Sequence, residues 1–199
     1  MSSHSLSRSR HHILLGTAFA LLLAAMLVIA PAAAARGAHH GKDPGKAPGS
    51  TFLFGGATVL QLDSGAVAAL GDTPVTALRP ARAVEGGFAF PIIVGEIEKP
   101  GSGEILHAGG LRFGTGESAL RLRRFIIDLD AGVLTARVFG VGRVPILSLA
   151  LLPSAPEGAI AAAEARLTQQ AAAALGNPSL EGALLGVATV RPERVCTSH

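Results

Sequence analysis

Apolar and polar residues alternate most regularly between Ala119 and Leu129, where leucines at 120 and 122 are separated by arginines. A period of two is typical of a strand with one buried and one solvated face. Beyond Arg124 the apolar positions shift by one residue, to Phe125 and alternate residues after it. A strand cannot change faces without an extra residue, so the pattern predicts a β-bulge near Arg124, or burial of both faces beyond it.

Shorter runs of apolar and β-branched residues predict further strands on both sides of this one. They are separated by turn signals and lie at Thr51–Leu62, Phe88–Val94, Gly109–Phe113, Val133–Phe139, Arg143–Leu152 and Leu184–Val190, whereas Thr73–Arg82 is extended and interrupted by prolines. A bend at Gly55-Gly56 interrupts the first run, and Pro91 requires an edge position or a bulge in the second.

Helical composition is confined to short segments. Asp63 precedes Ala66–Leu70, either as a turn or as the cap of a short helix. Thr168 is a suitable N-cap for a helix up to Leu175, and the Ala-rich segment Glu157–Arg166 is a candidate extension of that helix. Since no βαβ alternation is visible, we expect a mainly β chain: an antiparallel β-sandwich or barrel-like domain with one or two short C-terminal helices.

The N-terminal segment has the three-part order of a secretory signal peptide. A polar stretch with two arginines leads into the apolar run Ile13–Ala30, and Pro31 with small residues follows as a cleavage region. The arginines are not adjacent, which favours the general secretory route. The alternative is an uncleaved membrane anchor. The expected organisation is a signal peptide at 1–35, a flexible linker at 36–50, a single β domain at 51–190 and a tail at 191–199.

Net charge and cysteine content exclude some classes of function. After cleavage behind Ala35, the chain keeps 15 of its 17 basic residues and all 14 acidic ones, a net charge of +1. A nearly neutral domain without tyrosine or tryptophan lacks the pattern of nucleic-acid-binding proteins. The single cysteine, Cys196, allows no internal disulfide, so packing alone must hold the fold, with Cys196 a free thiol or an intermolecular partner.

No convincing catalytic set is present. The chain has no G-x-S-x-G motif, and His107 is the only histidine far from the termini. Glu96 and Glu98 alternate near Glu104, but an acid–base site would need a cleft that joins them to His107. An exposed strand face explains these carboxylates equally well, so we expect a protein that is not an enzyme and has no catalytic or metal-ion site.

A group of arginines lies in the same central stretch as the regular alternation. We expect one solvent-facing sheet surface to carry Arg112, Arg121 and Arg123, together with Arg124 and Arg137. Such a surface could bind carboxylates or a sulfated or phosphorylated envelope polymer. The alternative is an ordinary solvated face, balanced by the acidic residues Glu117, Asp128 and Asp130.

His107 stands just before a Gly-Gly pair. A neutral imidazole can ligate haem iron or hydrogen-bond a loop carbonyl, and residue statistics favour the structural role. The phrase Leu106–Leu111 (LHAGGL), followed by the alternating strand and by FIID and LTA, resembles a pattern in secreted bacterial β domains. The resemblance is to the Htaa (haem-transport-associated) domain group and its uncharacterised relatives, and it covers about Thr51–Val190.

The resemblance implies haem binding, which in Htaa domains uses a tyrosine and a histidine. His107 would take the histidine's place, whereas this chain contains no tyrosine. The expected function is a non-catalytic structural or interaction module, without a cofactor, that is secreted or attached to the cell envelope and meets an envelope or extracellular partner. The alternative is Htaa-like binding of haem or another small ligand through His107, with Arg112, Arg121 and Arg123 as further candidate ligand-binding residues. Nucleic acid is not expected as a partner, and a membrane only through an uncleaved signal segment.

Overall fold

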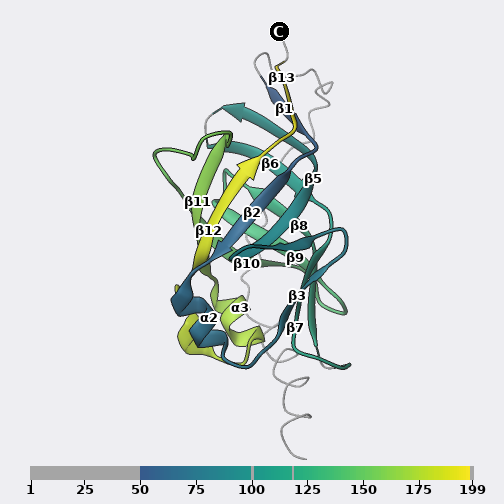
Figure 1. The fold of residues 1–199 in the computed structure, drawn as a ribbon, viewed down its shortest axis with the longest axis vertical. Coiled ribbons are helices and arrows are strands. Elements are labelled where there is room, and N and C mark those ends of the chain that lie inside the picture. Colours follow the sequence, from purple (N-terminus) through teal and green to yellow (C-terminus); the bar gives the residue numbers. More distant parts are fainter. Residues whose placement is uncertain (1–49, 100, 118, 198–199) are drawn as a thin grey trace, which may run out of the picture. The chain divides into compact units, whose positions relative to one another are not determined.

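The computed structural model describes residues 50–99, 101–117 and 119–197; the predicted signal peptide and nearly all of the predicted linker lie outside them. Strands dominate this part of the chain (Figure 1). In chain order the elements are β1 (Thr51–Phe54), β2 (Ala57–Leu62), α2 (Ser64–Leu70), β3 (Val75–Leu78), β4 (Arg82–Val84), β5 (Gly87–Lys99), β6 (Ser102–His107), β7 (Gly110–Phe113), β8 (Leu120–Asp128), β9 (Val133–Val138), β10 (Gly142–Leu151), β11 (Ala161–Leu167), α3 (Gln169–Ala174), the 3-10 helix η2 (Pro178–Leu180), β12 (Leu184–Arg191) and β13 (Arg194–Thr197).

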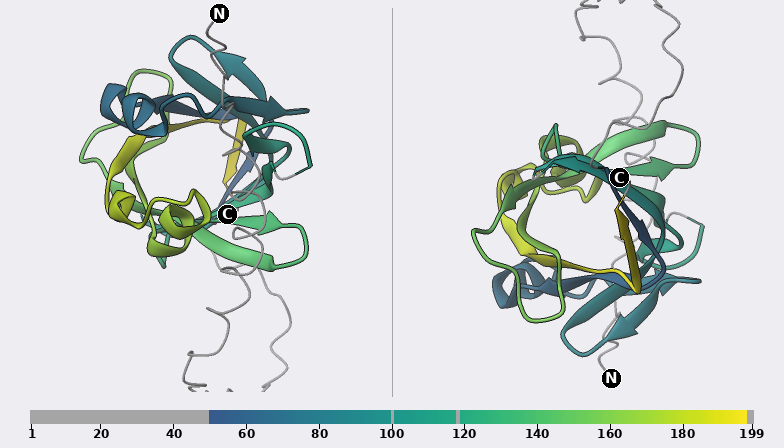
Figure 2. Two further views of the ribbon diagram at one scale, coloured as in Figure 1. Left: turned by 90° about the horizontal axis from the view of Figure 1, so that it is seen from below. Right: turned by 90° about the horizontal axis from the view of Figure 1, so that it is seen from above.

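The strands form one antiparallel sheet that closes into a barrel (Figure 2). Going round the barrel, each strand pairs with the next in the order β5, β2, β12, β11, β10, β9, β8 and β6. Closure depends on β6, because this strand pairs with β5 on one side and with β8 on the other. The prediction of a mainly β fold is confirmed, and of its two alternatives the barrel is the one that forms.

The ring of eight strands is closed, but the shorter strands β3 and β4 leave a gap in the hydrogen bonding beside it. The first half of β5 pairs with β4, and β7 pairs with β3, but no pairing joins β3 to β4 among the described residues. Only the turn Arg79–Ala81 links these two strands. We call β3, β4 and this turn the seam; it lies beside the point where β6 ends and β7 begins.

Bulges and bends divide the strands into more pieces than the sequence predicted. The bulge near Arg124 is confirmed: Arg124 has a φ of 52°, and the register between β8 and β9 shifts between Arg123 and Ile126. A bend at Gly55 and Gly56 separates β1 from β2, as predicted. These bulges and bends let the sheet curve and twist into a closed barrel.

Two segments differ from their predicted structure. Glu157–Arg166, the candidate helix extension, lies mostly in β11, because its alanines pack into the sheet between β10 and β12. The predicted tail at 191–199 contains β13, which pairs with β1 and places Cys196 opposite Phe52. Cys196 is exposed and forms no disulfide.

The predicted short helices are confirmed. Asp63 caps α2 by accepting hydrogen bonds from the backbone N–H groups of Gly65 and Ala66, and Thr168 caps α3 through that of Ala171. Both helices lie at one end of the barrel (Figure 1). Across residues 50–99, 101–117 and 119–197, no helix is long and apolar enough to cross a membrane.

Two apolar clusters fill the barrel. The larger contains Leu60, Phe90 and Phe125, and the rings of the two phenylalanines meet edge to face with centroids 4.9 Å apart. The smaller contains Leu53, Ile105 and Ile127. The boundary between the two clusters is where the candidate site lies.

Candidate functional site at His107

His107 is the last residue of β6 and points into the barrel. Side chains two residues apart on a strand share a face, and Ile105 of the same strand belongs to the smaller apolar cluster. His107 is opposite Ile92 on β5, which is also in that cluster. The imidazole is 2% exposed, so it belongs to the barrel interior.

The imidazole has one side-chain partner. Its Nε2 lies 2.7 Å from the hydroxyl oxygen of Thr58, which is equally buried on β2. Thr58 is opposite Phe90 of the larger apolar cluster, so this polar pair lies between the two clusters. Nδ1 makes no hydrogen bond of ordinary geometry, although the main chain of Ile105 and Phe125 is close to it.

Burial keeps His107 neutral. Desolvation lowers the pKa of the imidazole from 6.5 to about 4, and the neighbouring main chain of Phe125 and Ile105 offsets only part of this effect. At neutral pH one ring nitrogen therefore carries the proton and the other has a free lone pair. With Nδ1–H facing main-chain groups, Nε2 would accept a hydrogen bond from the hydroxyl of Thr58.

The Gly-Gly pair after His107 lets the chain pass through a crowded place. Gly109 has a φ of 84°, and a Cβ at this position would lie 2.7 Å from the Cβ of Ala81 in the seam. A Cβ on Gly110 would collide with the carbonyl oxygen of Leu122 on β8. The glycines thus allow the seam to lie against the barrel wall directly beside His107.

In this closed arrangement the residues around His107 do not fit haem. An axial ligand needs a nitrogen lone pair facing the iron, whereas Nε2 faces Thr58 and the ring is enclosed by apolar side chains. Among the residues that the structure describes, no group of histidine, cysteine and carboxylate side chains could hold a metal ion either. In this arrangement His107 is therefore a buried residue whose side chain is hydrogen-bonded to Thr58.

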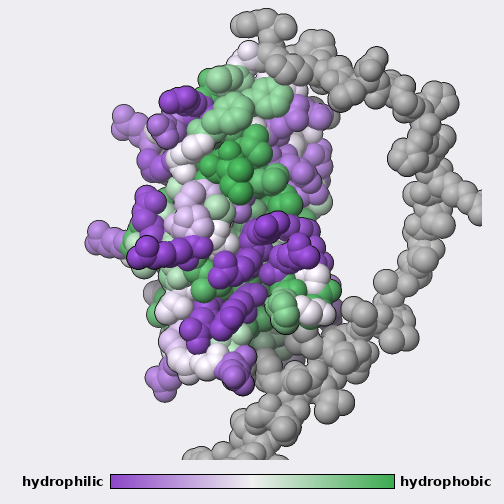
Figure 3. Space-filling model, turned by 90° about the vertical axis from the view of Figure 1, so that its right-hand side faces the viewer, coloured by the Kyte–Doolittle hydropathy of each residue, from purple (hydrophilic) through white to green (hydrophobic). Residues whose placement is uncertain are grey.

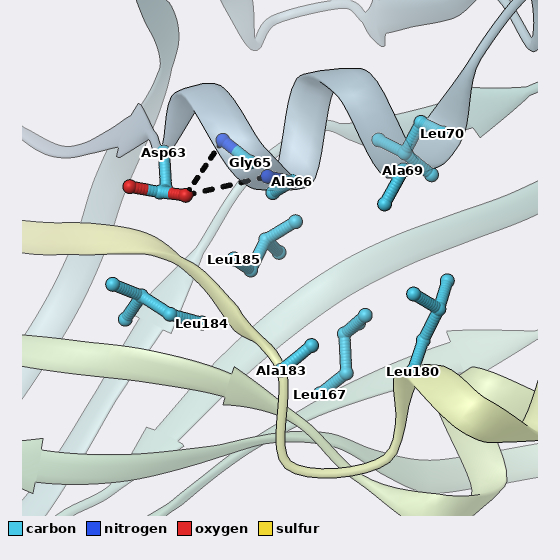
Figure 4. Close-up of a pocket in the computed structure, with 10 residues that line it drawn as sticks. All are labelled: Asp63, Gly65, Ala66, Ala69, Leu70, Leu167, Leu180, Ala183, Leu184 and Leu185. Atoms are coloured by element: carbon cyan, nitrogen blue, oxygen red, sulfur yellow. Dashed lines mark hydrogen bonds between the residues drawn. The ribbon is translucent and has the colours of Figure 1, made fainter.

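A pocket of about 220 Å³ lies elsewhere, at the helical end of the barrel (Figure 4). Leu70 of α2 and Leu180 of η2 face each other across it, and Leu167 and Leu185 line it beside them. Its one carboxylate, Asp63, is occupied in capping α2. Ligand sites for drug-sized molecules usually hold at least about 300 Å³ and a few convergent polar groups, so this pocket lacks the features of a ligand site. The sequence did not predict it, because its lining comes from segments far apart in the chain.

The structure brings the three candidate arginines onto one outer face. Arg112 on β7 is directly opposite Arg121 on β8, and Arg123 lies two residues further along β8 on the same face. Arg137 and Arg143 on the next two strands extend this surface, and Arg143 was not among the predicted residues. We call Arg112, Arg121, Arg123, Arg137 and Arg143 the arginine face.

Two of the three acidic residues that were expected to balance these charges, Asp128 and Asp130, have other partners. The carboxylate of Asp128 accepts a hydrogen bond from the backbone of Ala131, and that of Asp130 accepts one from the backbone of Gly103. Within the described part of the chain, the recorded ion pair is Arg166–Glu164, which lies outside the arginine face. The arginine face is therefore not an evenly balanced surface.

The arginine face and His107 do not form one site, because they lie on opposite sides of the barrel wall. The same is true of the carboxylates: Glu96 and Glu98 are exposed on β5, whereas His107 points inward. No cleft joins these three residues, so the acid–base arrangement considered above is not assembled.

The comparisons with known proteins bear on the fold. No family model matches the chain, and no curated protein matches it. The crystal structure of the C-terminal domain of HtaA from Corynebacterium glutamicum is similar with a TM-score of 0.55 and 18% sequence identity, over 74% of this chain and 98% of that one. The crystal structure of the heme binding protein HtaB from the same organism gives a TM-score of 0.48 and 12% identity, over 75% of this chain and 98% of that one. The likeness to HtaA shows a shared fold and confirms, at that level, the Htaa resemblance seen in the sequence.

Proposed function

We propose that this protein is an exported, non-catalytic binding module that takes up a small, flat ligand at the seam beside His107, with haem as the first candidate. The observation that supports it is the shared fold with the HtaA domain, in a chain whose LHAGGL phrase places His107 at the interruption of the barrel wall. The predicted signal peptide supports the exported location.

The seam is where the wall opens at the lowest cost. Separating two hydrogen-bonded strands breaks several ladder bonds at once, and each buried group left without a partner costs about 1–3 kcal/mol. Between β3 and β4 no such ladder exists in the described structure. A small displacement of the Arg79–Ala81 turn would expose the interior next to His107 without breaking the ring of strands.

His107 would contribute a polar contact inside an otherwise apolar site, once its Nε2 leaves the hydroxyl of Thr58. Opening the seam would give a ligand access to the imidazole, whose neutral state at pH 7 leaves a lone pair available. When bound, haem would supply an iron that accepts such a lone pair. The absence of tyrosine means that the tyrosine contact of Htaa domains has no counterpart here.

Titration of the mature protein, from residue 36 onward, with haemin tests this proposal. We expect a saturable Soret shift for the unchanged protein and binding that is roughly tenfold weaker in His107→Ala, as for the loss of one buried polar contact. The matched variant Thr58→Val releases Nε2 and should keep binding. Circular dichroism spectra of each variant would show that the barrel is folded.

Two results would contradict the proposal. A protein that shows no Soret shift does not bind haem, and a shift that His107→Ala leaves unchanged places the ligand away from the seam. In the first case the second candidate function, a structural or interaction module, is favoured by the filled interior and the unbalanced arginine face.

A further inference from the structure

The hairpin between β9 and β10 exposes an aromatic side chain with no role in the fold. Phe139 at its tip is 96% exposed, and Val141 two residues later is 41% exposed. Gly140 and Gly142 have φ values of 77° and 108°, and each lies in open space. A phenylalanine that contacts almost nothing in its own chain gains no stability from burial, so the domain alone does not explain it.

The strands that form this hairpin, β9 and β10, carry two residues of the arginine face, and β8 beside them carries two more. Arg123, Arg137 and Arg143 are directly opposite one another across β8, β9 and β10. Neighbouring strands are about 4.8 Å apart, and like charges placed directly opposite destabilise a sheet. Arg112 and Arg121 form a second opposed pair on β7 and β8.

The exposed tip and the arginines lie side by side. Leu122 is opposite Val138, the last residue of β9, so Phe139 follows in the turn at the level of Arg121. The acidic residue nearest to this pair along β8 is Glu117, on the loop between β7 and β8. Figure 3 shows a broad hydrophilic area on the side of the domain where β3 and β7 lie.

We propose that the β9–β10 hairpin and the arginine face form a docking surface for a membrane whose lipids carry anionic phosphate headgroups. Arginines close to such a surface are attracted to its phosphates, and an aromatic tip gains free energy by entering the headgroup region. A soluble polyanion would use the arginines but leave Phe139 in water, so the apolar tip favours the membrane. This inference does not depend on the proposed ligand at the seam.

Co-sedimentation with lipid vesicles tests the docking surface. The protein from residue 36 onward contains every residue that the structure describes and lacks the apolar N-terminal run, which would bind lipid by itself. We expect binding to vesicles of phosphatidylcholine mixed with phosphatidylglycerol, little binding to phosphatidylcholine alone, and weaker binding at high salt.

Two variants separate the contributions of charge and of the apolar tip. Phe139→Ala should weaken binding about tenfold, and the double variant Arg123→Gln/Arg137→Gln by tenfold or more. Each variant has a matched control.

Leu151→Ala is the control for the apolar change, because Leu151 is 48% exposed at the opposite end of β10. Arg82→Gln/Arg194→Gln is the control for the charge change, because it removes the same charge from β4 and β13. Both controls should bind vesicles as the unchanged protein does.

Three outcomes would overturn this inference. They are absence of binding to anionic vesicles, equal loss in the arginine variant and its charge control, and retention of full binding by Phe139→Ala. In the last case, competition by soluble polyphosphate would identify the arginine face as a polyanion site instead of a membrane surface.

Discussion

His107 and Arg123 lie on neighbouring parts of the barrel wall, but one side chain is buried and neutral and the other is exposed and charged. His107 faces inward, is held neutral by burial and has a dedicated partner in Thr58. Arg123 faces outward, directly opposite Arg137, with Arg143 one strand further away. The inner face of the wall at this place is thus uncharged, whereas the outer face carries several positive charges.

This difference distinguishes a feature that the fold requires from one that it does not. A buried imidazole between two apolar clusters needs its hydrogen bond and neutral state for the barrel to be stable. Opposed arginines on an exposed face lower stability slightly and contribute nothing to the core. Arg143 has a structural role, because it donates hydrogen bonds to the carbonyl oxygen of Arg124 and the hydroxyl of Thr135. The opposed charges of Arg123 and Arg137 have no such role, and it is for them that we propose a partner.

The largest expected effect concerns the chain beside His107. Gly109→Ala should destabilise the domain by about 4 kcal/mol, from a positive φ and from the contact with Ala81. Gly116→Ala on the outer loop is the matched control, because it has a similar φ of 70° but open space around it, and should cost about 1 kcal/mol. Urea unfolding monitored by circular dichroism measures both changes. Equal losses would mean that the seam does not press against Gly109.

The next effect is the dependence of stability on pH. The pKa of His107 is about 4 in the folded chain and 6.5 without its surroundings, so between these values the unfolded chain binds a proton that the folded one does not. The stabilisation is complete above pH 6.5 and decreases toward pH 4, by about 3 kcal/mol. Urea unfolding at a series of pH values should show this decrease in the free energy of unfolding. In His107→Gln the part of the decrease that comes from the imidazole should be absent. A variant that keeps the full slope would show that other groups cause it.

The smallest expected effect is on the outer face. Arg137→Thr should stabilise the domain by about 0.5 kcal/mol at low salt, because it removes a positive charge from between Arg123 and Arg143. High salt should abolish the gain by screening. In the control Arg166→Thr the paired arginine is lost, so no stabilisation is expected. Thermal unfolding at two salt concentrations provides the comparison, and a destabilising Arg137→Thr would indicate that Arg137 has a structural partner.

Much of the fold could be predicted because it depends on local patterns. The alternation in β8 and the extra residue at Arg124 follow from the period of a strand, and the helix caps at Asp63 and Thr168 follow from side-chain chemistry. β11 could not be predicted in this way. Its alanines have a high helix propensity, and only pairing with β10 and β12 makes them a strand.

The candidate site was predictable in its residue types and not in its contacts. The sequence indicated His107 as the distinctive residue of its stretch, and five arginines as one face. Thr58 lies 49 positions away from His107, and its role depends on the pairing of β2 with β5 and of β5 with β6. Arg143 joins the arginine face in the same manner, through the pairing of β10 with β9.

By itself, the sequence determined which residues alternate, where the chain turns and which side chains can carry charge, since these properties depend on neighbours a few residues apart. The tertiary structure alone decided that the sheet closes through β6, that a seam remains between β3 and β4, and that His107 faces inward while the arginines face outward. Closure pairs strands that are distant in the chain, and burial follows from closure. The same stretch of sequence therefore supplies a neutral core residue to one side of the wall and a charged surface to the other.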